Sequence, residues 1–276
     1  MEIKSSRYIN SEFRKEALPS YEILFEYCNG NLACFISKEN KLLFFDTFIW
    51  NYTDLVKELS NLDNIFKSFD FFEPATENFQ ISLSYKSSGF TLIPQELYDP
   101  ENKIDFLNFL LQEKQLFVGE TPLKSMKAIS IFPFQNEILE FFMQKFSNVN
   151  LTHSTALWLD KFLADSKIGQ ELIAVRVNNS FIELAYIYNK TLKLANIYGF
   201  ETAEDLMFYI LSITQQYRIN RERCELIVGG FILQDSKIFA LFQKYFSNVY
   251  FQKANDKLAI GNELQHTYFP HFSHLT

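Results

Sequence analysis

Hydrophobic and polar positions follow two similar patterns, one in each half of the chain. Each pattern opens with three short apolar runs separated by polar turns, which is typical of strands joined by hairpins. The predicted strands are residues 23–27, 32–37 and 42–47 in the first half, and 172–177, 181–188 and 192–197 in the second. Both halves therefore begin with three predicted hairpin-connected strands.

A helix followed by a strand recurs later in both halves. Apolar residues at helical spacing predict helices over 138–146 and 238–246, with Phe142 and Phe242 at matching positions. The run Phe-Ser-Asn-Val ends each helix and opens the next predicted strand. Because these two segments lie a constant 100 residues apart, they indicate two copies of one structural unit.

The starts of two earlier helices also match. Asn51 and Thr202 are each an N-cap type of residue with an acid three positions later, at Asp54 and Asp205. Such a pair satisfies free backbone amides and complements the helix dipole. The two acids are 151 residues apart whereas the later helices are 100 residues apart, so the first copy carries about 51 residues that the second lacks.

The extra residues predict a small subdomain inserted in the first copy. The expected elements are a hairpin-like stretch at 79–85 and 89–93, a turn at 98–100 and a helix within 104–111. The expected domains are residues 1–165 and 166–276, with 63–125 inserted in the first.

This order of elements resembles a known fold. Three hairpin strands, then helix, strand, helix and strand, is the order of a ribonuclease H-like unit, a mixed sheet flanked by helices. Two such units in tandem, with an inserted α+β subdomain in the first lobe, resemble the α/β fold of actin-like ATPases. In overall pattern the chain also resembles an uncharacterised bacterial family with this fold. The resemblance implies ATP and Mg²⁺ as candidate cofactors, and a ligand between the two lobes.

The run Glu225–Gly230 is the best single motif for a nucleotide. Actin-like proteins place a strand ending in Gly-Gly beside the adenosine, since glycine lets the backbone approach without a Cβ clash. A tight turn from strand to helix is the alternative. The corresponding strand of the first copy is expected to end at Ile131–Pro133, so that only the second copy keeps the glycines.

The hairpins where actin-like ATPases bind phosphate depart from the family pattern. That pattern is Asp-x-Gly, in which the acid positions the water shell of the metal and backbone amides cradle phosphate. Here Glu26 and Arg176 stand at the acid positions, and Asn-Gly and Asn-Ser follow in sequences that also suit plain hairpin turns. The candidate nucleotide-binding residues are Gly229, Gly230, Glu26, Asn29, Gly30, Asn178, Asn179 and Ser180. Only eight of the 276 residues are glycine, so phosphate loops rich in glycine are not expected and no catalytic residue is assigned.

Composition excludes several classes of function. The net charge is −7 and no dense cluster of Lys and Arg is present, which argues against a nucleic-acid partner. The apolar runs are too short to span a membrane and the first residues lack a secretory signal, so a cytoplasmic location is expected. Cys28, Cys34 and Cys224 form no Cys-x-x-Cys clip and are expected to be free thiols.

The C-terminal segment gathers His266, His271 and His274 among aromatic residues. Three histidines at this spacing are compatible with a metal, but neither a carboxylate nor a cysteine accompanies them. An aromatic tail that docks on the body of the protein is expected instead, and no metal site is assigned.

The predicted function is that of an interaction platform, which holds an unidentified protein partner and binds nucleotide without efficient hydrolysis. The alternative is an ATP-dependent enzyme, either an ATPase or a sugar-kinase-like protein, with divergent phosphate motifs. The acids to test would then be Asp46, Asp54, Glu26 and Glu183. A structural protein without a ligand is a third interpretation. A ribonuclease H-type nuclease is disfavoured, because Glu26 is the sole acid on the strands that would hold two metal ions.

Overall fold

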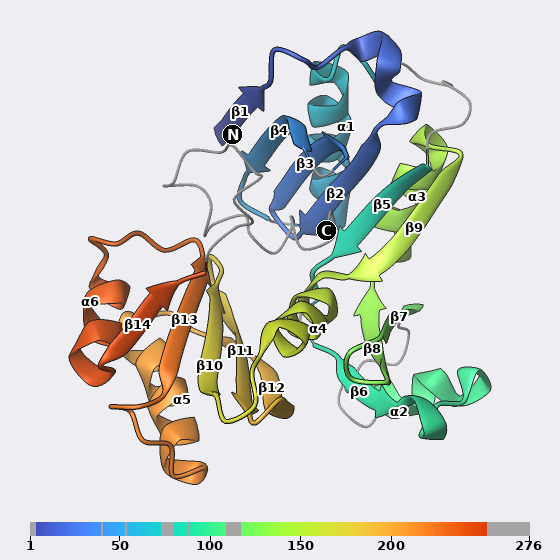
Figure 1. Ribbon diagram of the computed structural model, residues 1–276. Helices are drawn as coiled ribbons and strands as arrows, with labels where there is room; N and C mark the ends of the chain where they lie inside the picture. Colours follow the sequence, from blue (N-terminus) through green and yellow to red (C-terminus); the bar gives the residue numbers. More distant parts are fainter. Residues whose placement is uncertain are drawn as a thin grey trace. The chain divides into compact units, whose positions relative to one another are not determined.

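The computed structural model describes residues 4–39, 41–52, 54–72, 80–87, 89–108 and 117–252 (Figure 1). The described chain divides into two units. The first comprises the residues up to Pro122 together with Ile129–Ser154, and the second comprises Leu123–Ala128 and the residues from Thr155 onward. The main boundary thus lies between Ser154 and Thr155, at the start of helix α4 (Ser154–Asp165). The sequence pattern places it later, at residue 165.

The first unit is built on a mixed sheet. Within the described ranges its strands lie in the order β1-β4-β3-β2-β5-β9. Their bounds are β1 Lys4–Ile9, β2 Glu22–Cys28, β3 Asn31–Lys38, β4 Lys41–Ile49, β5 Gln80–Tyr85 and β9 Asn148–His153. Strands β2, β3 and β4 form the predicted hairpins, and β5 and β9 continue the sheet in parallel. Strand β1, which the sequence pattern does not predict, pairs antiparallel with β4, and the short helix η1 (Lys15–Ser20) leads into β2.

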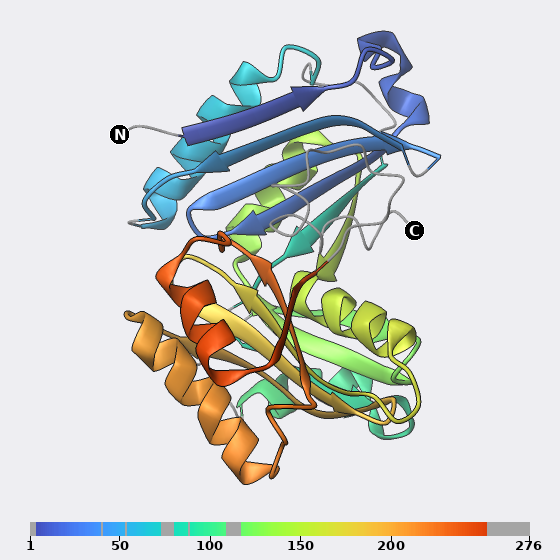
Figure 2. The same ribbon diagram turned by 60° about the vertical axis from the view of Figure 1, so that its left-hand side comes forward.

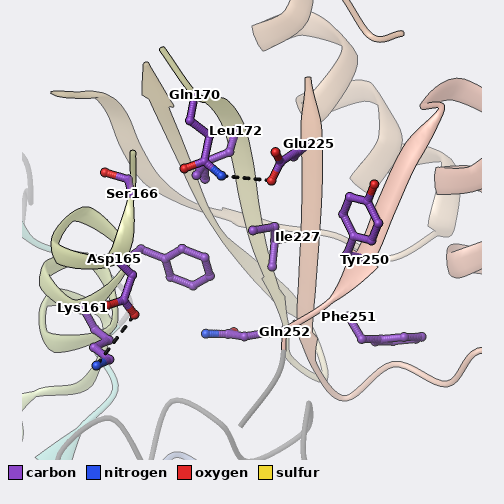
Figure 3. A pocket seen from close by; sticks show the side chains of 11 residues that line it. Lys161, Asp165, Ser166, Gln170, Leu172, Glu225, Ile227, Tyr250, Phe251 and Gln252 are labelled. Atoms are coloured by element: carbon purple, nitrogen blue, oxygen red, sulfur yellow. Dashed lines mark hydrogen bonds and ion pairs between the residues drawn. The ribbon is translucent and has the colours of Figure 1, made fainter. Parts of the chain in front are cut away.

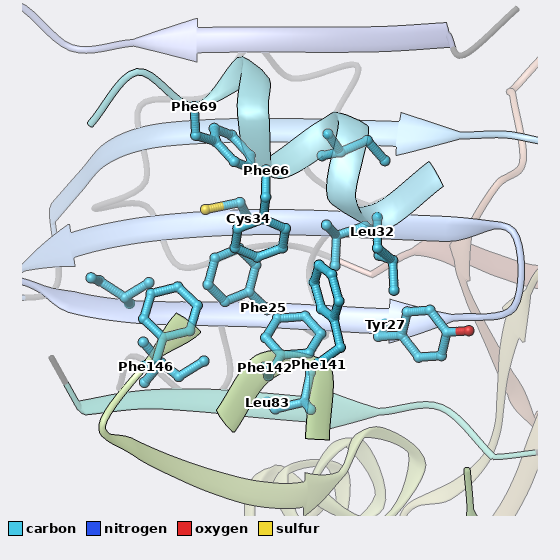
Figure 4. Packing of buried hydrophobic residues seen from close by; sticks show 14 of the residues in the cluster. Phe25, Tyr27, Leu32, Cys34, Phe66, Phe69, Leu83, Phe141, Phe142 and Phe146 are labelled. Carbon is cyan, nitrogen blue, oxygen red and sulfur yellow. The ribbon is translucent and has the colours of Figure 1, made fainter. Parts of the chain in front are cut away.

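Aromatic side chains fill the core on one face of this sheet (Figure 4). Helices α1 (Leu55–Ser68) and α3 (Asn136–Lys145) cover that face. Phe25 of β2 packs against Phe66 of α1 and Phe142 of α3, with ring centroids 5.3 Å apart in both pairs. Alternate residues of each strand point to this face, so the abundant Phe side chains pack there and are shielded from water.

The second unit contains a sheet of the same design. Its described strands lie in the order β12-β11-β10-β13-β14. Their bounds are β10 Glu171–Val177, β11 Phe181–Tyr188, β12 Thr191–Gly199, β13 Glu225–Gly230 and β14 Asn248–Phe251. Two antiparallel pairings are followed by two parallel ones, as in β4-β3-β2-β5-β9 of the first sheet. Figure 2 shows α5 (Ala203–Gln216) and α6 (Lys237–Tyr245) on the same side of this sheet, where their buried side chains share one core.

The two Phe residues that mark the sequence repeat occupy matching places. Phe142 of α3 and Phe242 of α6 are both fully buried, each in the core of its own unit. In both helices the carbonyl of this Phe accepts the backbone N–H of the C-cap residue, Phe146 or Phe246, at 2.9 Å. In each unit, the Phe-Ser-Asn-Val run therefore ends a helix and opens the parallel strand at one edge of the sheet.

One of the two predicted helix starts is confirmed and the other is wrong. Thr202 caps α5 in a full capping box with Asp205, as the sequence pattern indicates. Asn51 does not cap α1. Asp54 itself is the N-cap residue, and its carboxylate accepts the Lys57 backbone N–H at 2.9 Å. An acid can stand at the N-cap, as Asp54 does, or three residues later, as Asp205 does, because its carboxylate can accept a backbone hydrogen bond at either position.

The predicted insertion at 63–125 is wrong in its boundaries. Helix α1 continues to Ser68, and β5 pairs with β2 and β9 in the main sheet and not with residues 89–93. The part of the chain that runs from β5 to α3 forms a separate sheet, with its strands in the order β6-β8-β7. Its elements are β6 Thr91–Pro94, η2 Gln95–Leu97, η3 Pro100–Asn102, α2 Lys103–Asn108, β7 Phe117–Leu123 and β8 Ala128–Phe134. The inserted segment therefore comprises β6, η2, η3, α2, β7 and β8.

The strand of the first unit that corresponds to β13 differs from the predicted one. Ile131–Pro133 belongs to β8 of the inserted segment, whereas β5 holds the place beside β2 that β13 holds beside β10. Strand β5 ends at Ser84 and Tyr85. The second unit alone still has the Gly-Gly ending, but its partner is a different strand.

Candidate functional site

The predicted site residues fall in three turns. Glu26, Asn29 and Gly30 belong to the β2–β3 hairpin of the first unit. In the second unit, the β10–β11 hairpin and the end of β13 are adjacent, because β10 and β13 pair in parallel with Arg176 opposite Gly229 and Val177 opposite Gly230. The structure thus brings Asn178, Asn179 and Ser180 near the Gly-Gly turn, within one unit.

A buried carboxylate already occupies the donors of the first hairpin. Glu58 of α1 is 1% exposed. Its Oε1 accepts the Gly30 backbone N–H at 3.0 Å and the Tyr27 hydroxyl at 2.9 Å, and its Oε2 accepts Trp50 Nε1–H at 2.7 Å. Burial raises the pKa of Tyr27 far above its ordinary value, so the hydroxyl stays protonated as a donor. An internal anion therefore holds the backbone amide that the actin-like resemblance assigns to phosphate.

Sequence reasoning missed Glu58, although a signal was present. Glu58 stands at helical spacing with Leu62 and Ile65, both of which are buried in α1. A charged residue on the apolar face of a predicted helix must find partners in the core, because an unpaired buried charge is costly. The position therefore marks an internal hydrogen-bonded group.

Gly30 is required by the backbone, independently of any ligand. Its φ of +77° lies in the left-handed region, and a Cβ there would lie 2.6 Å from the carbonyl oxygen of Trp50. The Gly30 carbonyl also accepts the Trp50 backbone N–H at 2.9 Å. The single Tyr27 O–H, which donates to Glu58 at 2.9 Å, also lies 3.2 Å from Oδ1 of the neighbouring Asn29. Both turn residues are thus used in packing the hairpin.

Glu26, the candidate for organising a metal, forms a buried ion pair. Its Oε1 lies 3.0 Å from Nζ of Lys86, and its Oε2 accepts the Ser154 hydroxyl at 2.7 Å. Glu26 and Lys86 are both buried. The ammonium group neutralises the carboxylate, which reduces its ability to attract a divalent cation. Lys86, directly after β5, was not predicted.

Arg176, at the corresponding place in the second unit, also has an internal partner. Its Nε and Nη2 donate to both carboxylate oxygens of Glu183 on β11. Arg176 is 1% exposed and Glu183 is fully buried. A bidentate pair of this kind fixes both groups. The Arg176–Glu183 ion pair is therefore buried inside the second unit.

Two polar groups and one ring complete this cluster. Glu183 also accepts the Thr155 hydroxyl and, at 3.1 Å, the Asn178 side-chain amide. The Arg176 guanidinium lies over the Trp158 ring at 5.3 Å from its centroid, which adds a cation–π contact. Asn178 thus acts in the charge cluster, whereas Asn179 and Ser180 are exposed in the turn.

The Gly-Gly ending of β13 is a tight turn, as the alternative interpretation states. Gly230 has φ +86°, and a Cβ would overlap the Val177 carbonyl oxygen and lie 2.8 Å from the Val177 nitrogen. The same carbonyl accepts the Phe231 backbone N–H at 2.8 Å. Close packing of the chain on itself accounts for glycine at this position.

The remaining acids of the enzyme alternative are also engaged. Asp46 is buried and lies 2.6 Å from Nε of Arg7, and Asp54 caps α1. In the part of the chain that the structure describes, no group of three or more His, Cys, Asp and Glu side chains is placed to hold a metal ion. The candidate acids in the described residues are therefore held in internal contacts.

Three expectations from composition concern the rest of the chain. Among the described residues, no disulfide joins Cys28, Cys34 and Cys224. Among the described helices, none has the length and apolar character needed to cross a membrane. The C-terminal histidines, His266, His271 and His274, lie outside the described residues.

Solved structures resemble this chain over nearly its whole length. One is a Bacteroides thetaiotaomicron protein with an actin-like ATPase fold and unknown function, with 18% identity, a TM-score of 0.76, and coverage of 88% of this chain and 94% of the other. Another belongs to a PilM-PilN type IV pilus biogenesis complex, with 10% identity, a TM-score of 0.59, and coverage of 91% and 95%. No curated protein matches the chain.

These likenesses, together with the two mixed sheets, define the chain as a protein with the actin-like ATPase fold. The predicted fold class is thereby confirmed. The chain belongs to the family described as "Protein of unknown function (DUF3822)", whose model matches residues 34–249. The bacterial family that the sequence pattern resembles is confirmed as well.

Gly230→Ala should destabilise the second unit strongly, because the new methyl group would meet the Val177 backbone. Gly169→Ala is the matched control, since Gly169 has a similar φ of +80° and no atom within 4 Å of the added Cβ. We expect the control to lower the free energy of unfolding by about 1 kcal/mol, the cost of the backbone conformation alone. Gly230→Ala should lower it by about 1–3 kcal/mol more. Chemical denaturation measures both, and equal losses would contradict the packing role of Gly230.

Proposed function

We propose that this protein is a cytoplasmic, non-hydrolysing member of the actin-like fold that serves as a platform for a protein partner. The observation that carries the proposal is the internal pairing of charge in both hairpins. Glu58 takes the Gly30 amide, Lys86 neutralises Glu26, and Glu183 neutralises Arg176. Phosphoryl transfer depends on metal ions and on donors that are ready to stabilise developing charge. Here those groups are committed to the chain itself.

Nucleotide binding without turnover is compatible with this proposal. Gly229 and Gly230 remain the proposed backbone contacts with an adenosine, although the space at the Gly230 Cβ position is taken by the Val177 backbone. Asn179 and Ser180 are exposed in the adjacent hairpin and are the remaining polar candidates. Phosphate would have to compete with the internal carboxylates for the buried donors, which opposes tight binding of the triphosphate.

The platform role draws on the fold and on the inserted segment. The PilM-PilN structure is a complex, so a protein of this fold is seen with a partner. That support is by analogy of fold. In this chain the inserted segment exposes large apolar side chains at Leu97 (70%), Ile104 (43%) and Phe117 (53%). We take these three side chains as the candidate surface for a partner, since an apolar patch formed from such groups would mark a protein-binding site. We also infer that the two units arose by duplication, which the matching strand orders support.

A single-turnover assay with purified protein and Mg²⁺-ATP tests the absence of hydrolysis. We expect phosphate release no faster than in buffer, because loss of one oxyanion-type donor alone costs about 10²–10³ in rate. Glu26→Gln should leave the rate of phosphate release unchanged. Glu22→Gln, on the exposed end of β2, is its control. Phosphate release that disappears in Glu26→Gln but persists in Glu22→Gln would instead establish the ATP-dependent enzyme.

Photo-crosslinking in cells tests the platform. A photoreactive amino acid that replaces Leu97 on the inserted segment should yield a discrete cross-linked protein, because this side chain is exposed and apolar. The matched position is Phe208 on α5, which is 66% exposed but lies in the second unit. Position 208 should give no such product. The same bands from both positions, or none from position 97, would contradict the role assigned to the inserted segment.

A further inference from the structure

A cavity lies in the second unit, and none of its lining residues belongs to the candidate nucleotide set. Its volume is about 390 Å³, and it opens between helix α4 and the strands β10, β13 and β14. Small-molecule sites are typically about 300–1,000 Å³ and mostly apolar, with a few placed polar groups. Apolar walls come from Phe162 of α4, Leu172 of β10, and the neighbouring pair Ile227 and Tyr250. This cavity is therefore of the size and character of a ligand site.

Within the part of the chain that the structure describes, one buried polar group in this cavity lacks a partner. Gln252 is 5% exposed, and its Oε1 accepts the Trp158 indole N–H at 3.3 Å. This hydrogen bond sets the orientation of the amide, and the side-chain nitrogen Nε2 at its other end has no hydrogen-bond partner among the described residues. Figure 3 shows the nitrogen end of Gln252 directed into the space between α4 and the strand that carries Ile227.

The partnerless nitrogen decides what kind of ligand group would fit. A buried N–H donor without an acceptor destabilises the protein, so a carbonyl or ring nitrogen placed there would remove a penalty that is already present. The aromatic side chains of Phe162 and Tyr250 in the lining favour a flat ring, which gains from stacking or edge contacts.

The charges in the lining argue against a nucleotide phosphate. Lys161 lies 3.7 Å from Asp165 and is thus paired, and the Glu225 carboxylate accepts the Gln170 amide at 2.9 Å. The lining therefore carries one more acid than base. An uncharged ring system suits this environment better than an anion.

We propose that this cavity binds a flat, uncharged ring compound whose carbonyl or ring-nitrogen acceptor pairs with Gln252. The proposal is independent of the proposed platform and of nucleotide binding, because the cavity shares no residue with the candidate nucleotide set. The ring would lie between Phe162 and the strand residues Leu172 and Ile227. Gln252 would favour ring compounds that carry a hydrogen-bond acceptor on the edge of the ring.

Two matched probes test this with the full chain. Oxindole is a flat bicyclic ring with a carbonyl acceptor, and indole has the same ring without the carbonyl. Titration followed by protein amide resonances should show saturable oxindole shifts at Ile227 and Tyr250, with Kd on the order of 1 mM for so small a molecule. Indole should bind about tenfold more weakly, because it gives Gln252 no acceptor.

Two variants separate the cavity from nonspecific binding. Gln252→Glu keeps an acceptor for the Trp158 N–H but removes the donor, and should weaken oxindole about tenfold. Gln243→Glu, an exposed position on α6, is its control for charge. Ile227→Trp should fill the cavity and abolish the shifts, and it remains informative should Gln252→Glu fail to fold. The absence of saturable shifts with oxindole, equal affinity for indole, or binding that both cavity variants leave unchanged would overturn the proposal.

Discussion

A carboxylate buried in a protein interior must find hydrogen-bond donors, and Glu58 finds three of them at the first hairpin. Its two oxygens join the Gly30 amide, the Tyr27 hydroxyl and the Trp50 indole, so helix α1 is tied to β2 and to the end of β4. Removing any donor would leave part of a buried charge unsatisfied, which is expensive. The position of α1 on the first sheet and the conformation of the hairpin therefore depend on each other.

The second unit meets the same constraint with different residues. Arg176 and Glu183 face each other across β10 and β11, and Thr155, Asn178 and Trp158 complete their surroundings. Breaking one side of such a pair is far more costly than replacing both, so neither residue is released readily to meet a ligand. In both units, charges at positions where an actin-like ATPase would handle phosphate have become part of the packing. This favours a fold retained for its surfaces over one retained for its chemistry.

Much of the fold could be predicted from local pattern. The hairpin strands, the Phe142 and Phe242 helices and the Thr202 capping box depend on spacing within a few residues, which one sequence displays directly. The boundaries of the insertion could not be predicted, because an apolar run does not reveal whether a strand such as β5 pairs with its neighbour or with β2. The partners of the site residues were missed for a related reason. Lys86 meets Glu26, and Glu58 meets Gly30, across long stretches of sequence, and only the folded sheet brings them together.

Hydrogen exchange at the Gly30 amide tests whether Glu58 occupies the first hairpin from within. If Glu58 holds this amide in the free protein, the amide should exchange slowly, with protection similar to that of the neighbouring strand amides in β2 and β3. Addition of Mg²⁺-ATP should leave its rate unchanged. Fast exchange in the free protein that becomes slow only with Mg²⁺-ATP would show that the amide is available to phosphate, and would contradict the account.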